Sequence, residues 1–192
     1  MNAEHALWEF AAEHPDLEVA TSECAINRTR QLIYISMVVL PGLILGPYSK
    51  TFPLPTSVGT MGTNDFIHGM INKGEVPFAP VWLVDVRDVA KAHIMALEKL
   101  PLPADDLKRF TINAGTFPWK KLAEHLLKTK PELRDRIIPL DTVPPLPGPL
   151  GSLDTTRAKE ILGCTEYIPM EKTFEDAVDD ILMLEKLWAK TD

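Results

Sequence analysis

Apolar positions follow two kinds of pattern along the chain. Short runs with the composition and alternation of strands cover residues 17–21, 32–39, 40–45, 80–84 and 109–114. Longer segments with apolar residues at the spacing of a helix face cover residues 3–13, 64–72, 87–100, 118–129, 155–162 and 174–188. Proline-rich loops are expected at 48–60 and 141–152. Because strands and helices alternate, the pattern predicts an α/β fold with a mostly parallel sheet.

Two of these segments support more detailed predictions. The run 40–45 is apolar on both faces, which favours a covered strand of a parallel sheet. In the last helical segment, Phe174 and Val178 begin a stripe that we expect to be buried. Thr173 and Asp176 resemble a capping box, so this helix is expected to start at about Phe174.

Composition and charge exclude several classes of protein. The chain has 192 residues, 45% of them hydrophobic and 24% charged, which is ordinary for a globular protein. Its net charge of -7 and the lack of a basic stripe argue against nucleic-acid binding. Cys24 and Cys164 lie far apart and form no zinc pattern. The longest apolar stretch, 32–45, is interrupted and shorter than the roughly 20 residues of a membrane span. The first residues do not resemble a signal peptide, so the cytoplasm is the expected compartment.

Common nucleotide-binding and catalytic motifs are missing from the sequence. A phosphate-binding turn needs closely spaced glycines between a strand and a helix, whereas Gly59, Gly62 and Gly69 have the wrong spacing and follow no predicted strand. Tyr48 is followed by Lys50 rather than by a lysine four residues on, where it would lower the pKa of the phenol. We therefore predict that Tyr48 is not a catalytic tyrosine.

The charged residues before the 87–100 helix allow two interpretations. Asp85 and Asp88 could act as a general acid and base. An ion pair with Arg87 and a cap on the helix explain the same residues more simply. His93 shares a helix face with apolar residues, and a half-buried structural histidine is expected there rather than a ligand.

Five segments taken in order resemble one known family. They are residues 3–10, the Pro-Gly-x-x-x-Gly-Pro stretch within 40–47, the Asp-Val-Arg-Asp-Val-Ala stretch within 84–93, residues 109–112 and residues 154–163. Together they resemble the extended short-chain dehydrogenase/reductase family, in the NAD-dependent epimerase/dehydratase superfamily. Within it, the ketoreductases related to dihydroflavonol reductase and methylglyoxal reductase are most similar. The resemblance implies the C-terminal part of a Rossmann-type doubly wound parallel sheet plus a small substrate-binding lobe.

The same resemblance implies a set of site residues and a cofactor, NADP(H). Pro41, Leu43 and Ile44 would line the nicotinamide pocket. Thr56 or Ser57 would lie near the phosphates of the cofactor. The substrate would be a small carbonyl compound, with residues 51–72 forming one wall of its pocket. No metal site and no catalytic residue are expected within this chain.

The resemblance also implies a division of the chain. Residues 1–50 would be a remnant of the Rossmann domain. Residues 51–192 would be mainly the substrate-binding lobe, with 80–100 returning to the Rossmann part.

The matching region starts just after the position where the family has its catalytic lysine. The glycine-rich turn and the Ser/Tyr/Lys catalytic set are absent from the sequence. We therefore expect no reductase activity, and little cofactor affinity, from this chain alone.

Residues 22–39 depart from the family pattern, because they split a strand that the family keeps continuous. The codons for Ser22, Glu23 and Cys24 can include a splice donor, and those for Val38 and Val39 a splice acceptor. Removal of the segment between them would restore the strand. The segment is therefore either a retained intron or an error in the prediction of the gene, which we favour, or a genuine surface insertion. If it is translated, its uncharged run 32–39 is prone to aggregation.

Three functions remain open from the sequence. The first is a fragment of an NADP(H)-dependent ketoreductase, which converts a carbonyl to an alcohol. The second is a non-catalytic domain that binds a small molecule or a partner. The third is a non-functional product of a broken or wrongly annotated gene.

Overall fold

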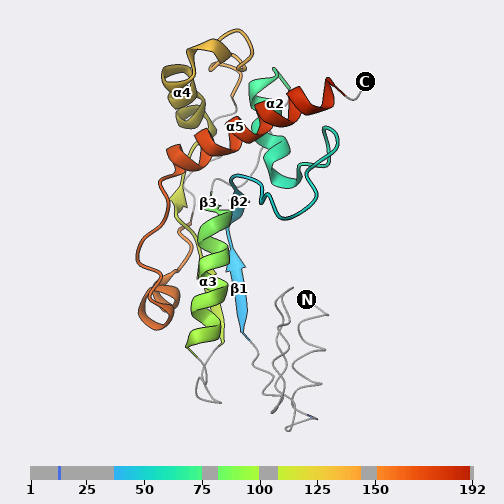
Figure 1. Ribbon diagram of the computed structural model, residues 1–192. Helices are drawn as coiled ribbons and strands as arrows, with labels where there is room; N and C mark the ends of the chain where they lie inside the picture. Colours follow the sequence, from blue (N-terminus) through green and yellow to red (C-terminus); the bar gives the residue numbers. More distant parts are fainter. Residues whose placement is uncertain (1–12, 14–36, 75–81, 100–107, 144–150, 191–192) are drawn as a thin grey trace. The chain divides into compact units, whose positions relative to one another are not determined.

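The computed structural model describes residues 13, 37–74, 82–99, 108–143 and 151–190 (Figure 1). The helix expected at 3–13, apart from residue 13, lies outside the described residues. So do the strand expected at 17–21 and the segment 22–36. The chain divides into two compact units. The first unit comprises Met1–Leu40, Lys91–Ile112 and Asp154–Thr165, and the second comprises Pro41–Ala90, Asn113–Leu153 and Glu166–Asp192.

The first unit contains a pair of strands and a short helical turn. β1 (Val38–Pro41) pairs with β4 (Arg109–Ile112), and the amide of Val38 donates to the carbonyl of Lys108 at 2.7 Å. Val38 and Val39, the last residues of the predicted insertion, therefore belong to a strand. The turn η3 (Ala158–Leu162) contacts β4 and has π-helical hydrogen bonding. It ends at Gly163, whose φ of 83° suits glycine.

The second unit is built on a three-stranded sheet in the order β2-β3-β5. β2 (Leu43–Leu45) runs parallel to β3 (Trp82–Asp85), with Leu45 opposite Asp85. β5 (Gly115–Thr116) pairs with β3 in the antiparallel direction. The predicted α/β fold with parallel strands is therefore confirmed.

Helices bury the apolar residues of the second unit. Its helical elements are η1 (Gly62–Asn64), α2 (Asp65–Ile71), α4 (Trp119–Thr129), η2 (Pro131–Leu133) and α5 (Met170–Trp188). One further helix, α3 (Val86–Glu98), starts in this unit and continues into the first. The core has contributions from the sheet, from α2, α4 and α5, and from the segment after α4; its largest fully buried members include Ile67, Leu83, Leu126 and Phe174. Trp119 packs against Phe174 with ring centroids 5.8 Å apart.

The start of α5 differs from the prediction. The helix begins at Met170, after Pro169 in an extended conformation, and not at Phe174. Thr173 is therefore an internal helix residue and not a cap. Its hydroxyl donates to Asp85 at 2.6 Å. The capping-box prediction was wrong because a partner 88 residues away in sequence uses this side chain.

A glycine breaks the apolar run predicted as one strand. β1 ends at Pro41 and β2 begins at Leu43, so Gly42 lies between two strands. A Cβ atom on Gly42 would lie 2.7 Å from the carbonyl oxygen of Trp82 and 2.7 Å from Oδ1 of Asn113. Only glycine permits this close approach of backbone segments.

Candidate functional site

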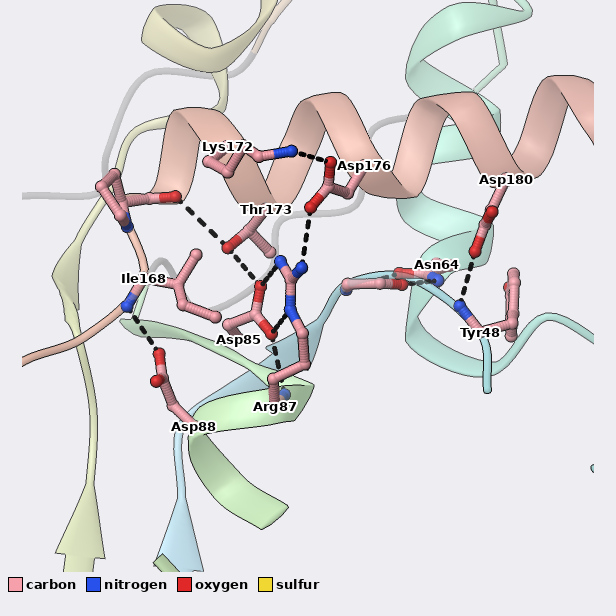
Figure 2. Close-up of polar contacts among 12 residues, drawn as sticks. Tyr48, Asn64, Asp85, Arg87, Asp88, Ile168, Lys172, Thr173, Asp176 and Asp180 are labelled. Carbon is pink, nitrogen blue, oxygen red and sulfur yellow. Dashed lines mark hydrogen bonds and ion pairs between the residues drawn. The ribbon is translucent and has the colours of Figure 1, made fainter. Parts of the chain in front are cut away.

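The carboxyl ends of two parallel strands define the candidate site. Because Leu45 and Asp85 are opposite each other, the segments that follow β2 and β3 leave the sheet at the same edge. In open α/β sheets, ligands bind at this edge. Figure 2 shows the polar contacts that surround it, contributed by Tyr48, Asn64, Asp85 and α5.

Asp85 is fully buried at this edge, with no exposed surface. Its two carboxylate oxygens accept from Nε and Nη2 of Arg87 at 2.9 and 2.7 Å. They also accept from the amide of Arg87 at 2.8 Å and from the hydroxyl of Thr173 at 2.6 Å (Figure 2). Burial alone would raise the pKa of Asp85, but the hydrogen bonds from Arg87 and Thr173 outweigh it and hold the pKa below its usual value.

Arg87 connects Asp85 to the long helix α5. Its Nη1 donates to Asp176 at 2.8 Å, and Lys172 forms an ion pair with the same carboxylate. The hydrogen bond to Asp85 and, after it, the hydrogen bond to Asp176 raise the pKa of Arg87. The guanidinium therefore fixes the first turns of α5 to the end of β3. The arrangement stabilises the site and leaves Asp85 ionised, so Asp85 is poorly suited to act as an acid.

The simpler interpretation of the two aspartates is confirmed for Asp85. This residue forms the ion pair with Arg87 and accepts its amide proton at the start of α3. Asp88 has a different role, since its Oδ2 accepts from the amide of Ile168 at 2.8 Å. Asp88 therefore holds the segment that leads into α5. His93 is half-buried, as expected for a structural histidine.

Tyr48 and Asn64 fix the turn that follows β2. The amide group of Asn64 bonds both backbone groups of Gly46, with its Nδ2 2.7 Å from the carbonyl oxygen. The amide of Tyr48 donates to Asp180 at 2.7 Å, and its hydroxyl donates to the carbonyl of Met61 at 3.0 Å. Burial raises the pKa of Tyr48, so its phenol stays protonated, and the hydroxyl is engaged by its hydrogen bond to Met61. This geometry agrees with the prediction that Tyr48 is not a catalytic tyrosine.

The residues expected to contact the cofactor fall into two groups. Pro41 is exposed at the end of β1, and Leu43 and Ile44 are half-buried in β2. Thr56 and Ser57 are exposed in the loop after β2. Half-buried apolar side chains suit a nicotinamide ring. The part of the chain that the structure describes shows no glycine-rich turn between a strand and a helix.

Thr56 lines two hollows in the surface of the second unit. The larger has a volume of about 690 Å³, and its walls are Leu54, Pro55, Thr56, Ser57, Val58, Leu184, Leu187 and Trp188. The smaller, of about 490 Å³, is lined by Tyr48, Pro53, Leu54, Pro55, Thr56, Thr60, Met61 and Gly62. Neither is lined by Pro41, Leu43 or Ile44.

Sequence reasoning missed several residues of the site. Thr173 and Asp176 were assigned to a helix cap, and Asn64 and Asp180 had no assigned role. Their contacts with Asp85, Arg87, Gly46 and Tyr48 join residues between 18 and 132 positions apart in the sequence. No local pattern identifies such contacts.

Within the described ranges, no helix is long and apolar enough to cross a membrane, and no group of three or more His, Cys, Asp or Glu side chains could hold a metal ion.

Comparison with known proteins identifies the family. No protein-family model matches the chain. It is 34% identical over 149 residues to "Ketoreductase azaE" of Aspergillus niger, a match that covers 76% of this chain and 43% of that protein. The crystal structure of Gre2 from Candida albicans in complex with NADPH matches with a TM-score of 0.67 and 26% identity, over 95% of this chain and 49% of Gre2. Vestitone reductase from alfalfa shares the fold, with a TM-score of 0.60 and 21% identity over 97% of this chain and 50% of the reductase.

These proteins are Rossmann-type reductases. The chain belongs to their family, the extended short-chain dehydrogenases/reductases, as the resemblance predicted. It spans less than half of the length of the curated relatives that it matches.

Proposed function

We propose that this chain is part of an NADP(H)-dependent ketoreductase, which reduces a small carbonyl compound to an alcohol. The observation that carries the proposal is the 34% identity to a ketoreductase. The similarity of the fold to a reductase in complex with NADPH supports it. In such an enzyme, the reduced nicotinamide supplies a hydride to the carbonyl carbon while a protein group gives a proton to the oxygen.

Within this enzyme, the chain would form the apolar side of the nicotinamide site. Leu43 and Ile44 lie in β2, one strand from the buried Asp85, and Pro41 immediately precedes them. The network of Asp85, Arg87 and α5 would keep these residues in place. The proposed division stays as predicted: 1–50 from the Rossmann domain, and 51–192 mainly from the substrate-binding lobe with 80–100 returning. The cytoplasm stays the expected compartment.

The proposal also predicts that the chain alone does not catalyse the reaction. The 192 residues contain no Tyr-x-x-x-Lys pair and no glycine-rich turn, so they supply neither the proton donor nor the phosphate cradle. The purified chain should show no carbonyl-dependent loss of NADPH absorbance. Turnover by the pure chain would show that the catalytic group lies within it.

A chimera tests the function itself. This chain would replace the matching segment of the Aspergillus niger ketoreductase, in one version with and in one without residues 22–39. We expect NADPH-dependent carbonyl reduction by the version without the segment. Equal activity of both versions would favour a genuine surface insertion over a retained intron. A folded chimera that binds NADPH and reduces no carbonyl compound would contradict the proposal.

The residues proposed to line the nicotinamide site are tested in the active chimera. Leu43→Ala and Ile44→Ala should raise the KM for NADPH, because each removes apolar surface that would pack against the ring. Ile94→Ala is the matched control, since this side chain is exposed on α3. If neither Leu43→Ala nor Ile44→Ala changes the KM for NADPH, the proposal that β2 lines the cofactor site is wrong.

A further inference from the structure

Two adjacent residues just before α2 bond the backbone at the end of β2. The hydroxyl of Thr63 donates to the carbonyl oxygen of Ile44. The side-chain amide of Asn64 donates to the carbonyl oxygen of Gly46 at 2.7 Å and accepts from the amide of Gly46 at 3.3 Å (Figure 2). Thr63 and Asn64 therefore form a clasp on the segment Ile44–Gly46, with one bond before Leu45 and two after it.

The clasp acts at the point where strand pairing ends. β2 has three residues, and its register with β3 runs only as far as Leu45 opposite Asp85. The next residue, Gly46, has a φ of 141°, a conformation that other residues rarely adopt. A Cβ atom on Gly46 would lie 2.9 Å from Cγ1 of Val86, so the turn lies close against the start of α3. Beyond Leu45, hydrogen bonds from the clasp replace those of the sheet.

The two members of the clasp differ in exposure. Asn64 is 5% exposed and uses both polar groups of its side chain on Gly46. Its loss would leave backbone groups without partners and disturb the fold. Thr63 is exposed, and its hydroxyl donates to the carbonyl of Ile44. Thr63 is therefore the member that can be changed with the fold preserved, and a change there acts first on Ile44.

We propose that Thr63 is a positioning residue for hydride transfer, which acts through Ile44 and not by contact with the cofactor. By holding the carbonyl of Ile44, the hydroxyl of Thr63 fixes the peptide plane beside it and, with it, the direction of the Ile44 side chain. This inference rests on the proposed function, in which Ile44 lines the nicotinamide site. Hydride transfer needs the reacting atoms in a narrow range of positions, and a displacement of about 1 Å can cost roughly a hundredfold in rate.

Thr63→Val tests the proposal in the chimera without residues 22–39, because valine keeps the shape of threonine and removes the donor. The rate of hydride transfer in a single turnover should fall by about tenfold, while the Kd for NADPH, measured by nicotinamide fluorescence, should change by less than about twofold. The ring keeps its apolar contacts and loses only its preferred orientation. Thr63→Ser restores the donor and should restore the rate.

Thr142→Val is the matched control. Thr142 is also an exposed threonine of the second unit, and its hydroxyl donates to the carbonyl of Pro139 at 2.6 Å. The substitution therefore removes the same kind of hydrogen bond without touching β2. It should leave both the rate of hydride transfer and the Kd for NADPH unchanged.

A second measurement needs neither cofactor nor catalysis. In the full chain, the carbonyl ¹³C NMR signal of Ile44 reports the hydrogen bond that this carbonyl accepts. The signal should move in Thr63→Val, return in Thr63→Ser and stay in place in Thr142→Val. An Ile44 signal that is the same in all four proteins would overturn the proposal, because the bond would then not hold this carbonyl.

The kinetic results separate this inference from the proposed function. An active chimera in which Thr63→Val transfers hydride at the original rate overturns the role of Thr63 and keeps the ketoreductase assignment. So does an equal loss of rate in Thr63→Val and Thr63→Ser, or a Kd for NADPH that rises as much as the rate falls, since Thr63 would then be a contact residue. A folded chimera that binds NADPH and reduces no carbonyl compound overturns the proposed function, and this inference with it.

Discussion

The hydroxyl of Thr173 should contribute more to stability than its methyl group. Thr173 and Asp85 are both fully buried, and their 2.6 Å hydrogen bond has an ionised acceptor. Hydrogen bonds to charged groups contribute roughly 1.5–3 kcal/mol. Thr173→Val keeps the shape of the side chain and removes the donor, so we expect the free energy of unfolding to fall by about 2 kcal/mol.

Thr173→Ser is the matched control for this prediction. It keeps the hydroxyl and loses one methyl group, which should cost about 1 kcal/mol. Denaturant unfolding is followed by tryptophan fluorescence, because Trp82, Trp119 and Trp188 all belong to the second unit. The difference in the free energy of unfolding between Thr173→Val and Thr173→Ser should become smaller in acid, where Asp85 becomes protonated. A valine variant as stable as the serine variant at neutral pH would refute the reasoning.

Three further predictions concern the stability of the second unit. Asp85 and Glu185 both have a lowered pKa in the folded protein. The contribution of these two carboxylates to the free energy of unfolding should therefore be complete above their usual pKa values of 3.8 and 4.5. It should be lost as the pH falls through their lower pKa values in the folded protein, as an acid titration of unfolding will show. Gly42→Ala should destabilise by about 1–3 kcal/mol in thermal unfolding, whereas Gly151→Ala, with open space around it, should have no effect. Phe174→Ala should cost about 3–5 kcal/mol in denaturant unfolding, and a cost below about 1 kcal/mol would contradict its place in the core.

Local patterns predicted the regular elements well and the contacts between them poorly. The helix expected at 118–129 is observed as Trp119–Thr129, because its apolar residues have clear helical spacing and Pro118 marks its start. The start of α5 was placed four residues too late. The reason is that Thr173 has a helix-cap sequence around it but bonds Asp85 on another element.

Neither the break at Gly42 nor the larger hollow, between residues 54–58 and the end of α5, could be predicted from the sequence, and the physical reason is the same. Gly42 is required by the backbone of Trp82, and the wall residues Thr56 and Leu187 meet only after the chain has folded. That Thr56 and Ser57 lie near the cofactor stays a prediction from the family resemblance.

Transfer of isotope from cofactor to product tests the proposed reduction most directly. The chimera without residues 22–39 would be incubated with 4-phenyl-2-butanone and with NADPH deuterated at the hydride position of the nicotinamide. Mass spectrometry of the alcohol should then show one deuterium at the carbon that carried the carbonyl. A folded chimera that binds NADPH but yields no deuterated alcohol would contradict the assignment of this chain to a ketoreductase.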